Sequence, residues 1–287
     1  MLIIEWLGEE RKTGADLTER IRRWSSPVEH RPCERAKDVL TALDDASKRI
    51  RVHGEVPVIH LEAHGHYAPN SGEPSGLCGP DGRGDEELLE WTTMTPLLGQ
   101  INAASQFQVL VVGAACHGLT ALDAFNVNSP APFSAHVAFG TEVHERRLFE
   151  CMVELYRQLL TKMHRSIPEA TQVANLELNL SEGEMLIAAS FHAFARQVIE
   201  GIAEEQLEPN YQLQNCSRLA LLASVNNGTR FDLEAMRRIQ NLALLDGCVR
   251  AVNTWFAYDI LPQNRQRFDI DVPTIFSRWQ QKYRARI

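Results

Sequence analysis

The chain has 287 residues, of which 44% are hydrophobic and 23% are charged, and its formal net charge at pH 7 is −8. These values are typical of a globular protein with a sizeable core, built as one large domain or as a medium domain with an appendage. The negative net charge argues against a nucleic-acid partner, because phosphate contact requires a basic surface. No apolar run reaches the roughly 18 residues of a membrane span, which argues against a membrane partner.

The N-terminus and the cysteines indicate a reducing compartment. The segment Met1–Trp6 lacks the charged-then-apolar layout of a signal peptide. Six cysteines are spread along the chain without a C-x-x-C spacing, at positions 33, 78, 116, 151, 216 and 248. In a long chain without an export signal, such cysteines are expected to be reduced thiols rather than a disulfide framework. We therefore expect a cytoplasmic protein.

Strand and helix patterns alternate at the start of the chain. Leu2–Leu7 is a short apolar run that predicts a strand, and Asp16–Trp24 carries apolar residues at helical spacing. A short strand over Val28–Cys33 and an amphipathic helix over Glu34–Ile50 follow, and the next apolar strand ends at His64. This alternation predicts a parallel α/β sheet with right-handed crossovers.

Residues 67–90 are rich in glycine and proline, which break regular structure. Within them, Leu77–Gly79 and Glu87–Trp91 can pair as a hairpin across Gly-Pro-Asp-Gly. Because this segment leaves from the strand that ends at His64, we expect it to shape a cleft there. Its exposure also makes residues 67–85 the predicted processing site.

Further strands and helices follow the predicted hairpin. A helix capped by Thr93 runs through Ala104, and the β-branched run Val109–Val112 predicts a buried strand of a parallel sheet. Ala135–Val143 predicts another strand, and Glu145–Met163 predicts a long helix with one apolar face. The α/β pattern therefore extends to about residue 165.

From residue 166 onwards the patterns are almost all helical. Ser166-Ile-Pro-Glu169 combines a serine cap, an early proline and a glutamate three residues after the cap. Later helices are predicted over Glu184–Ile202, Leu233–Leu245, Val249–Ile260 and Asp271–Arg284. We expect an α/β domain over residues 1–165 and a helical C-terminal region over 166–287, packed on or beside it. This region is a candidate binding site for a regulatory protein or a partner subunit.

Two of the predicted strands end in residues that can carry chemistry. One ends in His64-Gly65, and the other is followed by Ala114-Ala-Cys116-His-Gly118. The carboxyl ends of neighbouring parallel strands meet at one edge of a sheet, where loops form the ligand crevice. A cysteine attacks carbonyl groups as a thiolate, and a nearby histidine can accept its proton. Cys116 is therefore the candidate nucleophile and His64 the candidate base.

This pattern resembles that of the caspase-like cysteine peptidases, including the bacterial CHAT group, in which a cysteine motif follows the histidine by about fifty residues. The resemblance covers residues 1–165. It implies a caspase-like, mostly parallel sheet flanked by helices, and an endopeptidase that cleaves a protein substrate by a Cys-His dyad without a cofactor or metal. It further implies an oxyanion hole from the amides of Gly65 and Cys116. The biology it implies is bacterial defence, such as antiviral defence, or regulated cell death.

The cysteine motif departs from the caspase signature at two positions. Ala114 stands where caspases have a glutamine, and His117 replaces the usual residue after the cysteine. In caspases the glutamine helps line the pocket for an aspartate side chain, so Ala114 occupies a substrate-binding position without that group. Strict cleavage after aspartate is therefore not implied.

Charges near the predicted site conflict over the residue before the scissile bond, called P1. Caspases hold an acidic P1 side chain with a basic residue in the loop after the first strand, and Arg11 corresponds to it. The adjacent Glu9 and Glu10 favour a basic P1 residue instead. Glu142 and His144, at the end of a later strand, are candidate walls of another substrate pocket. The sequence leaves the P1 residue open.

Several alternatives stay open beside the peptidase. The same fold can serve as a catalytically inactive pseudo-protease, a binding or signalling module in which Cys116 is a buried thiol. Acyl transfer to an acceptor other than water is not distinguished from hydrolysis, and Glu62 is a candidate for orienting His64. A zinc site would draw on His60, His64, His66, Cys78 and His117. The i, i+4 spacing of His60 and His64 suits a helix, however, and this segment is a predicted strand.

Overall fold

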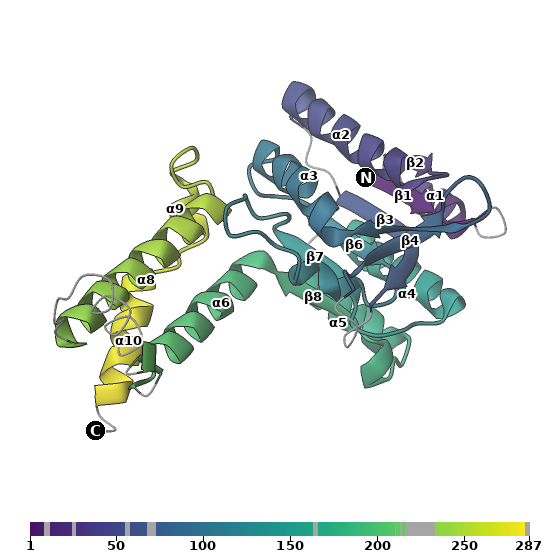
Figure 1. The fold of residues 1–287 in the computed structure, drawn as a ribbon. Helices are drawn as coiled ribbons and strands as arrows, with labels where there is room; N and C mark the ends of the chain where they lie inside the picture. The colour runs from purple at the N-terminus through teal and green to yellow at the C-terminus, as the bar shows by residue number, and fades with distance from the viewer. Residues whose placement is uncertain are drawn as a thin grey trace. The chain divides into compact units, whose positions relative to one another are not determined.

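The computed structural model describes residues 1–8, 12–24, 27–54, 58–67, 73–162, 166–209, 211–212, 214–215 and 233–284. The chain divides into two compact units, Met1–Phe191 and His192–Ile287 (Figure 1). The first unit contains a mixed α/β structure with a mostly parallel sheet flanked by helices, and the second is helical. The predicted fold class is therefore confirmed at this level.

The central sheet of the first unit has the strand order β2-β1-β3-β6-β7-β8. Its strands are β1 (Leu2–Trp6), β2 (Glu29–Pro32), β3 (Val58–His66), β6 (Leu110–Ala114), β7 (Ala135–Phe139) and β8 (Leu186–Ser190). Neighbouring strands are parallel except for β8, which is antiparallel to β7. The strands β1 and β6 are buried on both faces, which explains their continuous apolar runs.

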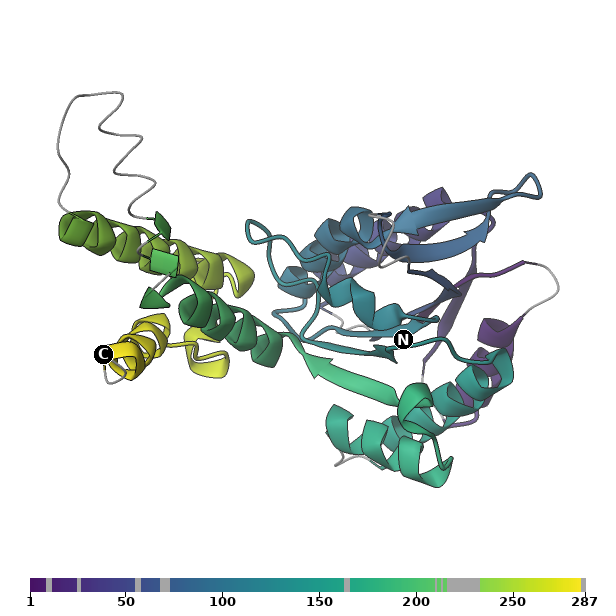
Figure 2. The ribbon, with the colours of Figure 1, turned by 60° about the horizontal axis from the view of Figure 1, so that its bottom comes forward.

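Helices cover both faces of this sheet. One face holds α1 (Thr13–Arg22), α4 (Glu145–Thr161) and α5 (Ile167–Glu177), whose apolar side chains form one core with Ile3, Val112, Val137 and neighbouring strand residues. Figure 2 shows these three helices together on one side of the sheet. The helices α2 (Ala36–His53) and α3 (Trp91–Ala104) pack against each other on the opposite side.

The strand β3 changes partners along its length. Its first part, Val58–Glu62, pairs in parallel with β6, and its last part, His64–His66, pairs in antiparallel fashion with β4 (Gly76–Pro80). The strand β4 in turn pairs with β5 (Glu86–Glu90), which confirms the predicted hairpin. The backbone of His64 therefore belongs to the hairpin layer rather than to the central sheet.

The prediction of a helix over Glu184–Ile202 is wrong at its start. Residues Leu186–Ser190 form β8, and the helix α6 (Phe191–Gln206) begins only after it. The side chain of Asn175 donates to the carbonyl oxygen of Leu186 at 2.9 Å and accepts from its N–H at 3.0 Å. This buried contact and the pairing with β7 override the helical pattern of the local sequence.

The first compact unit extends beyond the predicted domain boundary at residue 165. The helix α5 begins at the predicted capping box of Ser166 and Glu169 but packs on α4, and β8 completes the sheet. No residue separates β8 from α6, because Ser190 ends the strand and Phe191 begins the helix. The N–H of Phe191 donates to the carbonyl oxygen of Ser134 at 3.1 Å, which ties this junction to the first unit.

The second unit contains most of α6 together with α8 (Leu233–Trp255), α9 (Asn264–Arg267) and α10 (Val272–Arg284). The prediction of separate helices over Leu233–Leu245 and Val249–Ile260 is wrong, because α8 runs without a break through Gly247. Tyr283 of α10 donates to the carbonyl oxygen of Glu204 in α6 at 2.8 Å. Among the helices of the described residues, none is both long and apolar enough to cross a membrane.

Candidate active site

Cys116 lies just beyond the end of β6, in a turn held by the backbone around it. The next residue, His117, has a left-handed backbone conformation with φ of 53° and precedes a short 3-10 helix, Gly118–Leu122. The N–H of His117 donates to the carbonyl oxygen of Thr141 at 3.1 Å, and the hydroxyl of Thr120 donates to the carbonyl oxygen of His117 at 2.9 Å. These bonds fix the turn that presents the thiol.

The thiol of Cys116 is in contact with the backbone of Val143. The sulfur Sγ lies 3.6 Å from the carbonyl oxygen of Val143, and the N–H of Val143 donates to Sγ at 3.4 Å. The backbone of Val143 therefore holds the sulfur of Cys116 on this side of the cavity.

Cys116 differs from the other cysteines in its exposure. Among the described cysteines it alone is partly exposed, and the others are buried. Burial raises the pKa of the Cys33 and Cys151 thiols to about 12, and that of Cys78 and Cys248 to about 11. Cys216 lies outside the described residues. The four buried thiols are therefore unreactive near neutral pH.

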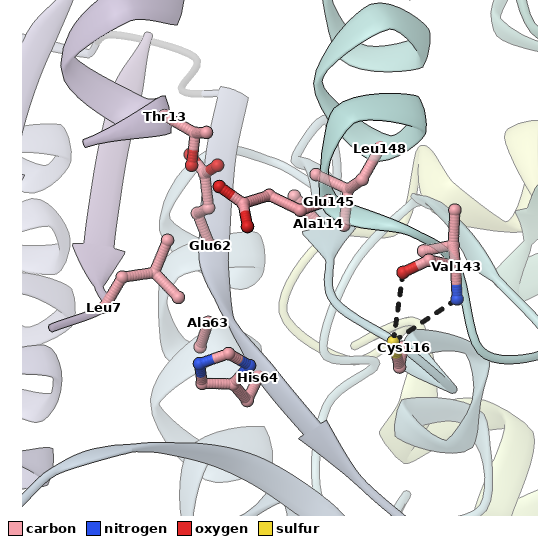
Figure 3. A pocket seen from close by; sticks show the side chains of 10 residues that line it. All are labelled: Leu7, Thr13, Glu62, Ala63, His64, Ala114, Cys116, Val143, Glu145 and Leu148. Atoms are coloured by element: carbon pink, nitrogen blue, oxygen red, sulfur yellow. Dashed lines mark hydrogen bonds between the residues drawn. The ribbon is translucent and has the colours of Figure 1, made fainter. Parts of the chain in front are cut away.

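His64 is exposed at the end of β3 and lines the same cavity as Cys116. No hydrogen bond joins the imidazole of His64 to Sγ within the described part of the chain. Figure 3 shows the imidazole on one side of the cavity, with Sγ turned toward Val143 on the other. The structure brings the two predicted residues to one cavity without a direct contact. Catalytic hydrogen bonds often tighten only when substrate binds.

Gly65 lies against the backbone of Cys116. A Cβ atom built on Gly65 would lie 1.7 Å from the carbonyl oxygen of Cys116 and 2.6 Å from its carbonyl carbon. Only glycine fits this approach, which holds the end of β3 beside the cysteine turn. The predicted oxyanion-hole amides thus come from two segments in direct contact.

The other predicted substrate-binding residues lie on two sides of Cys116. Ala114 is buried and lines the inner cavity. Glu142 and His144 line a separate open groove of about 520 Å³, together with Gly65, His66, Tyr67, Cys116, His117 and Val143. Arg11 lies outside the described residues, as do Glu9 and Glu10. The inner cavity and the open groove therefore share Cys116.

The inner cavity also contains residues that the sequence analysis did not assign to it. Glu62 lines it together with Leu7, Thr13 and Glu145. Nε2 of His60 lies 3.4 Å from Oε2 of Glu62, and no hydrogen bond joins Glu62 to His64 among the described residues, so the suggestion that Glu62 orients His64 is not supported. The signal in the sequence was an acidic residue between the apolar residues Leu61 and Ala63 of a predicted strand.

The residues considered for zinc do not form a cluster. His60 is fully buried, and its Nδ1 lies 2.9 Å from the hydroxyl oxygen of Tyr156. His66 lies beside Glu73, with 3.5 Å between Nε2 and Oε2. Over the described residues, no group of three or more histidine, cysteine, aspartate or glutamate side chains is placed to hold a metal ion.

Comparison with known proteins adds no relative to this picture. The sequence matches no protein-family model, and no curated protein matches it significantly. The residues and their geometry are therefore the basis for the function proposed below.

Proposed function

We propose that this protein is a caspase-like cysteine endopeptidase in which Cys116 is the nucleophile and His64 the general base. The observation that carries the proposal is that His64 and Cys116 are both accessible at the inner cavity. An exposed histidine and a partly exposed cysteine end neighbouring strands and line that cavity, while the other described cysteines are buried. This combination gives a thiol both a proton acceptor and access to a peptide bond.

The proposed reaction follows from these positions. His64 takes the thiol proton of Cys116, and the thiolate attacks the carbonyl carbon of the scissile peptide bond. The amides of Gly65 and Cys116 stabilise the oxyanion. His64 then gives the proton to the leaving amine, and the C–N bond breaks to leave an acyl-enzyme. Water, deprotonated by His64, hydrolyses the thioester and regenerates the thiol. This sequence uses no cofactor.

The open groove and the inner cavity suit a polypeptide substrate. The groove of about 520 Å³ passes over Gly65, Cys116 and His144, and can hold an extended chain across the thiol. The inner cavity branches from Cys116 and can receive one side chain. We propose a partner protein as substrate and, from the resemblance to CHAT proteins, a role in bacterial defence or regulated cell death. The helical second unit is the proposed binding region for a regulator.

A second candidate function is a pseudo-protease that binds a partner without cleaving it. The contact of Sγ with both the N–H and the carbonyl oxygen of Val143 favours it, because the thiol already has backbone partners and no bond to His64. Activity requires a rotation that turns Sγ from Val143 toward the imidazole. A pseudo-protease does not make this rotation.

The deciding experiment maps new protein N-termini in cells that express the wild type, Cys116→Ala or His64→Ala. His53→Ala is the matched control, since this exposed imidazole at the end of α2 lines neither the inner cavity nor the open groove. A peptidase generates termini with the wild type and with His53→Ala, and none with the other two variants. Termini that persist in Cys116→Ala would exclude Cys116 as the nucleophile. If the wild type generates none and its purified Cys116 shows no selective alkylation, the pseudo-protease is correct.

A further inference from the structure

The inner cavity beside Cys116 is narrow and has one polar end. Its volume is about 80 Å³. On the same measure a water molecule needs roughly 10–15 Å³, so the cavity admits a group of roughly five to eight heavy atoms. The outer part of one long side chain has this size. The cavity is therefore suited to a single substrate side chain rather than to a backbone segment.

The walls of the cavity are aliphatic between its two ends. Apolar side chains line it, contributed by Leu7, Ala63, Ala114, Val143 and Leu148. Figure 3 shows His64 and Cys116 at one end and Glu62, Thr13 and Glu145 toward the other. Apolar walls with acidic groups beyond them match a side chain that has a methylene stem and a cationic head.

Glu62 is the most deeply buried acidic group of this cavity. Its relative exposure is 3%, and its Oε2 has no hydrogen-bond donor in the described residues. Nε2 of His60 lies 3.4 Å from Oε2 without forming a hydrogen bond, and this nitrogen likewise has no hydrogen-bond partner among the described residues. Buried carboxylate oxygens are ordinarily paired, because an unpaired one loses its hydration without compensation. Among the described residues, the carboxylate of Glu62 is therefore not fully hydrogen-bonded within the fold.

Glu5 on the neighbouring strand is also a buried carboxylate, but both of its oxygens have partners. It stands opposite Glu62 in the pairing of β1 with β3, and it is also buried. Its Oε1 accepts from the N–H of Gly14 at 2.9 Å, and its Oε2 lies 2.6 Å from Nε2 of His30. Both oxygens of Glu5 are thus paired within the fold. A carboxylate buried in this layer can therefore have hydrogen-bond partners for both of its oxygens.

The distance along β3 matches the reach of a basic side chain. Glu62 precedes His64 by two residues on the same face of the strand, which corresponds to roughly 6.5 Å. An extended lysine or arginine side chain that enters beside the thiol spans a distance of this order. A glutamate or aspartate would instead bring another carboxylate toward the buried carboxylate of Glu62, and like charges at a desolvated site repel strongly.

We propose that the inner cavity is the P1 pocket and that it selects lysine or arginine, with Glu62 binding the cationic head. This proposal rests on the peptidase function proposed above and names its substrate class. The aliphatic walls hold the methylene stem, and the carboxylate of Glu62 accepts from the ammonium or guanidinium group. The scissile bond then lies between Cys116 and His64 at the cavity mouth.

The test measures the rate at which peptidyl chloromethyl ketones with P1 arginine, leucine or aspartate alkylate Cys116 of the full chain, with loss of chloride and with iodoacetamide as the reference reagent. We expect the arginine reagent to react at least about tenfold faster than the other two. Glu62→Gln should lower the ratio of the arginine to the leucine rate about tenfold. Glu177→Gln, which removes the same charge at an exposed position outside the cavity and the groove, is the matched control and should change this ratio by less than about twofold.

The outcomes distinguish a failure of the P1 pocket assignment from a failure of the proposed peptidase function. If iodoacetamide modifies Cys116 no faster than the buried cysteines, the proposed function fails. If Cys116 is modified selectively but the arginine reagent has no advantage, or Glu62→Gln leaves the ratio unchanged, the pocket assignment alone is overturned. Preference for aspartate would also overturn it.

A measurement on the wild type covers the case in which Glu62→Gln does not fold. Butylguanidinium should slow the alkylation of Cys116 by iodoacetamide, because it places a guanidinium beside Glu62. Butylurea has the same shape without the charge and should not slow it. Equal protection by both compounds, or protection by neither, would overturn the proposal.

Discussion

The carbonyl group of Cys116 occupies the space that a side chain on Gly65 would need. The distance from a Cβ on Gly65 to this oxygen would be 1.7 Å, and the atoms in conflict belong to the backbone. Neither segment can relieve the conflict by a rotamer change. The end of β3 and the cysteine turn are therefore locked together by the absence of a side chain at one position.

Replacing Gly65 by alanine should abolish catalysis and destabilise the fold. The new methyl group must push β3 away from the turn of Cys116, at a cost of about 1–3 kcal/mol or more in the free energy of unfolding. Gly140→Ala is the matched control, because its nearest atoms lie 3.5 Å and 3.6 Å from the new Cβ, which is ordinary contact. Denaturant unfolding and the rate of Cys116 alkylation measure both effects. Equal behaviour of the two variants would contradict the close approach.

The cysteines should differ widely in reactivity at pH 7.5. The pKa of about 11 for Cys78 and Cys248, and of about 12 for Cys33 and Cys151, leaves at most roughly one thiolate in several thousand molecules. We expect iodoacetamide to modify Cys116 first, at a rate at least about tenfold above theirs. Peptide mass spectrometry of the folded protein follows each site. Uniform labelling would count against a reactive cysteine.

His136 should make stability depend on pH. Its ring is fully buried with Nδ1 3.2 Å from the carbonyl oxygen of Val111 and Nε2 3.0 Å from that of Gly118, and burial lowers its pKa below the ordinary value near 6.5. Between the lower pKa of the folded state and pH 6.5, His136 is therefore protonated in the unfolded chain and neutral in the folded chain. The stabilisation is complete above pH 6.5 and is lost as the pH falls toward the lower folded pKa, by at most about 1.4 kcal/mol per pH unit.

The measurement for His136 is denaturant unfolding at several pH values between 8 and 5. His136→Gln should remove part of the fall in stability on acidification, and His53→Gln, at an exposed position, should retain the wild-type pH dependence. If His136→Gln loses stability with pH as steeply as the wild type, this histidine is not the group that responds.

Asn175 should hold β8 in the sheet. Its amide makes two buried hydrogen bonds to the backbone of Leu186, and Asn175→Ala leaves both backbone groups without these partners. We expect a loss of about 2–3 kcal/mol in the free energy of unfolding and faster hydrogen exchange in β8. Asn128→Ala, at an exposed position, should change stability by less than about 0.5 kcal/mol. A similar small effect for Asn175→Ala would mean that strand pairing alone holds β8.

The parts of the fold that could be predicted are those with a strong local pattern. The buried run Val109–Val112, the capping box at Ser166 and the Gly-Pro-Asp-Gly hairpin each carry their own physical signal, and all three were identified. The strand Leu186–Ser190 could not be identified in this way, because its pairing with β7 depends on residues far away in the sequence. A helical pattern in a short apolar segment does not decide between the two structures.

The candidate site was predictable in part for the same reason. His64 and Cys116 end apolar strands, so their position at one edge of the sheet follows from the parallel order. The inner cavity is different, because it joins Glu62, Ala114 and Leu148 from three elements with Leu7 from the segment after β1, and no local pattern brings these together. The glutamate between Leu61 and Ala63 in β3 was the one visible sign of it.

The junction of β8 and α6 has a mechanical consequence. Ser190 ends the strand, Phe191 begins the helix, and the Phe191 ring packs against Phe125 and Phe133 with centroids 6.2 Å and 6.0 Å apart. Ser190 also pairs with Ala135 at the end of the ladder between β7 and β8. The three packed rings therefore fasten the last residue of β8 within the first unit, immediately before the chain enters the second.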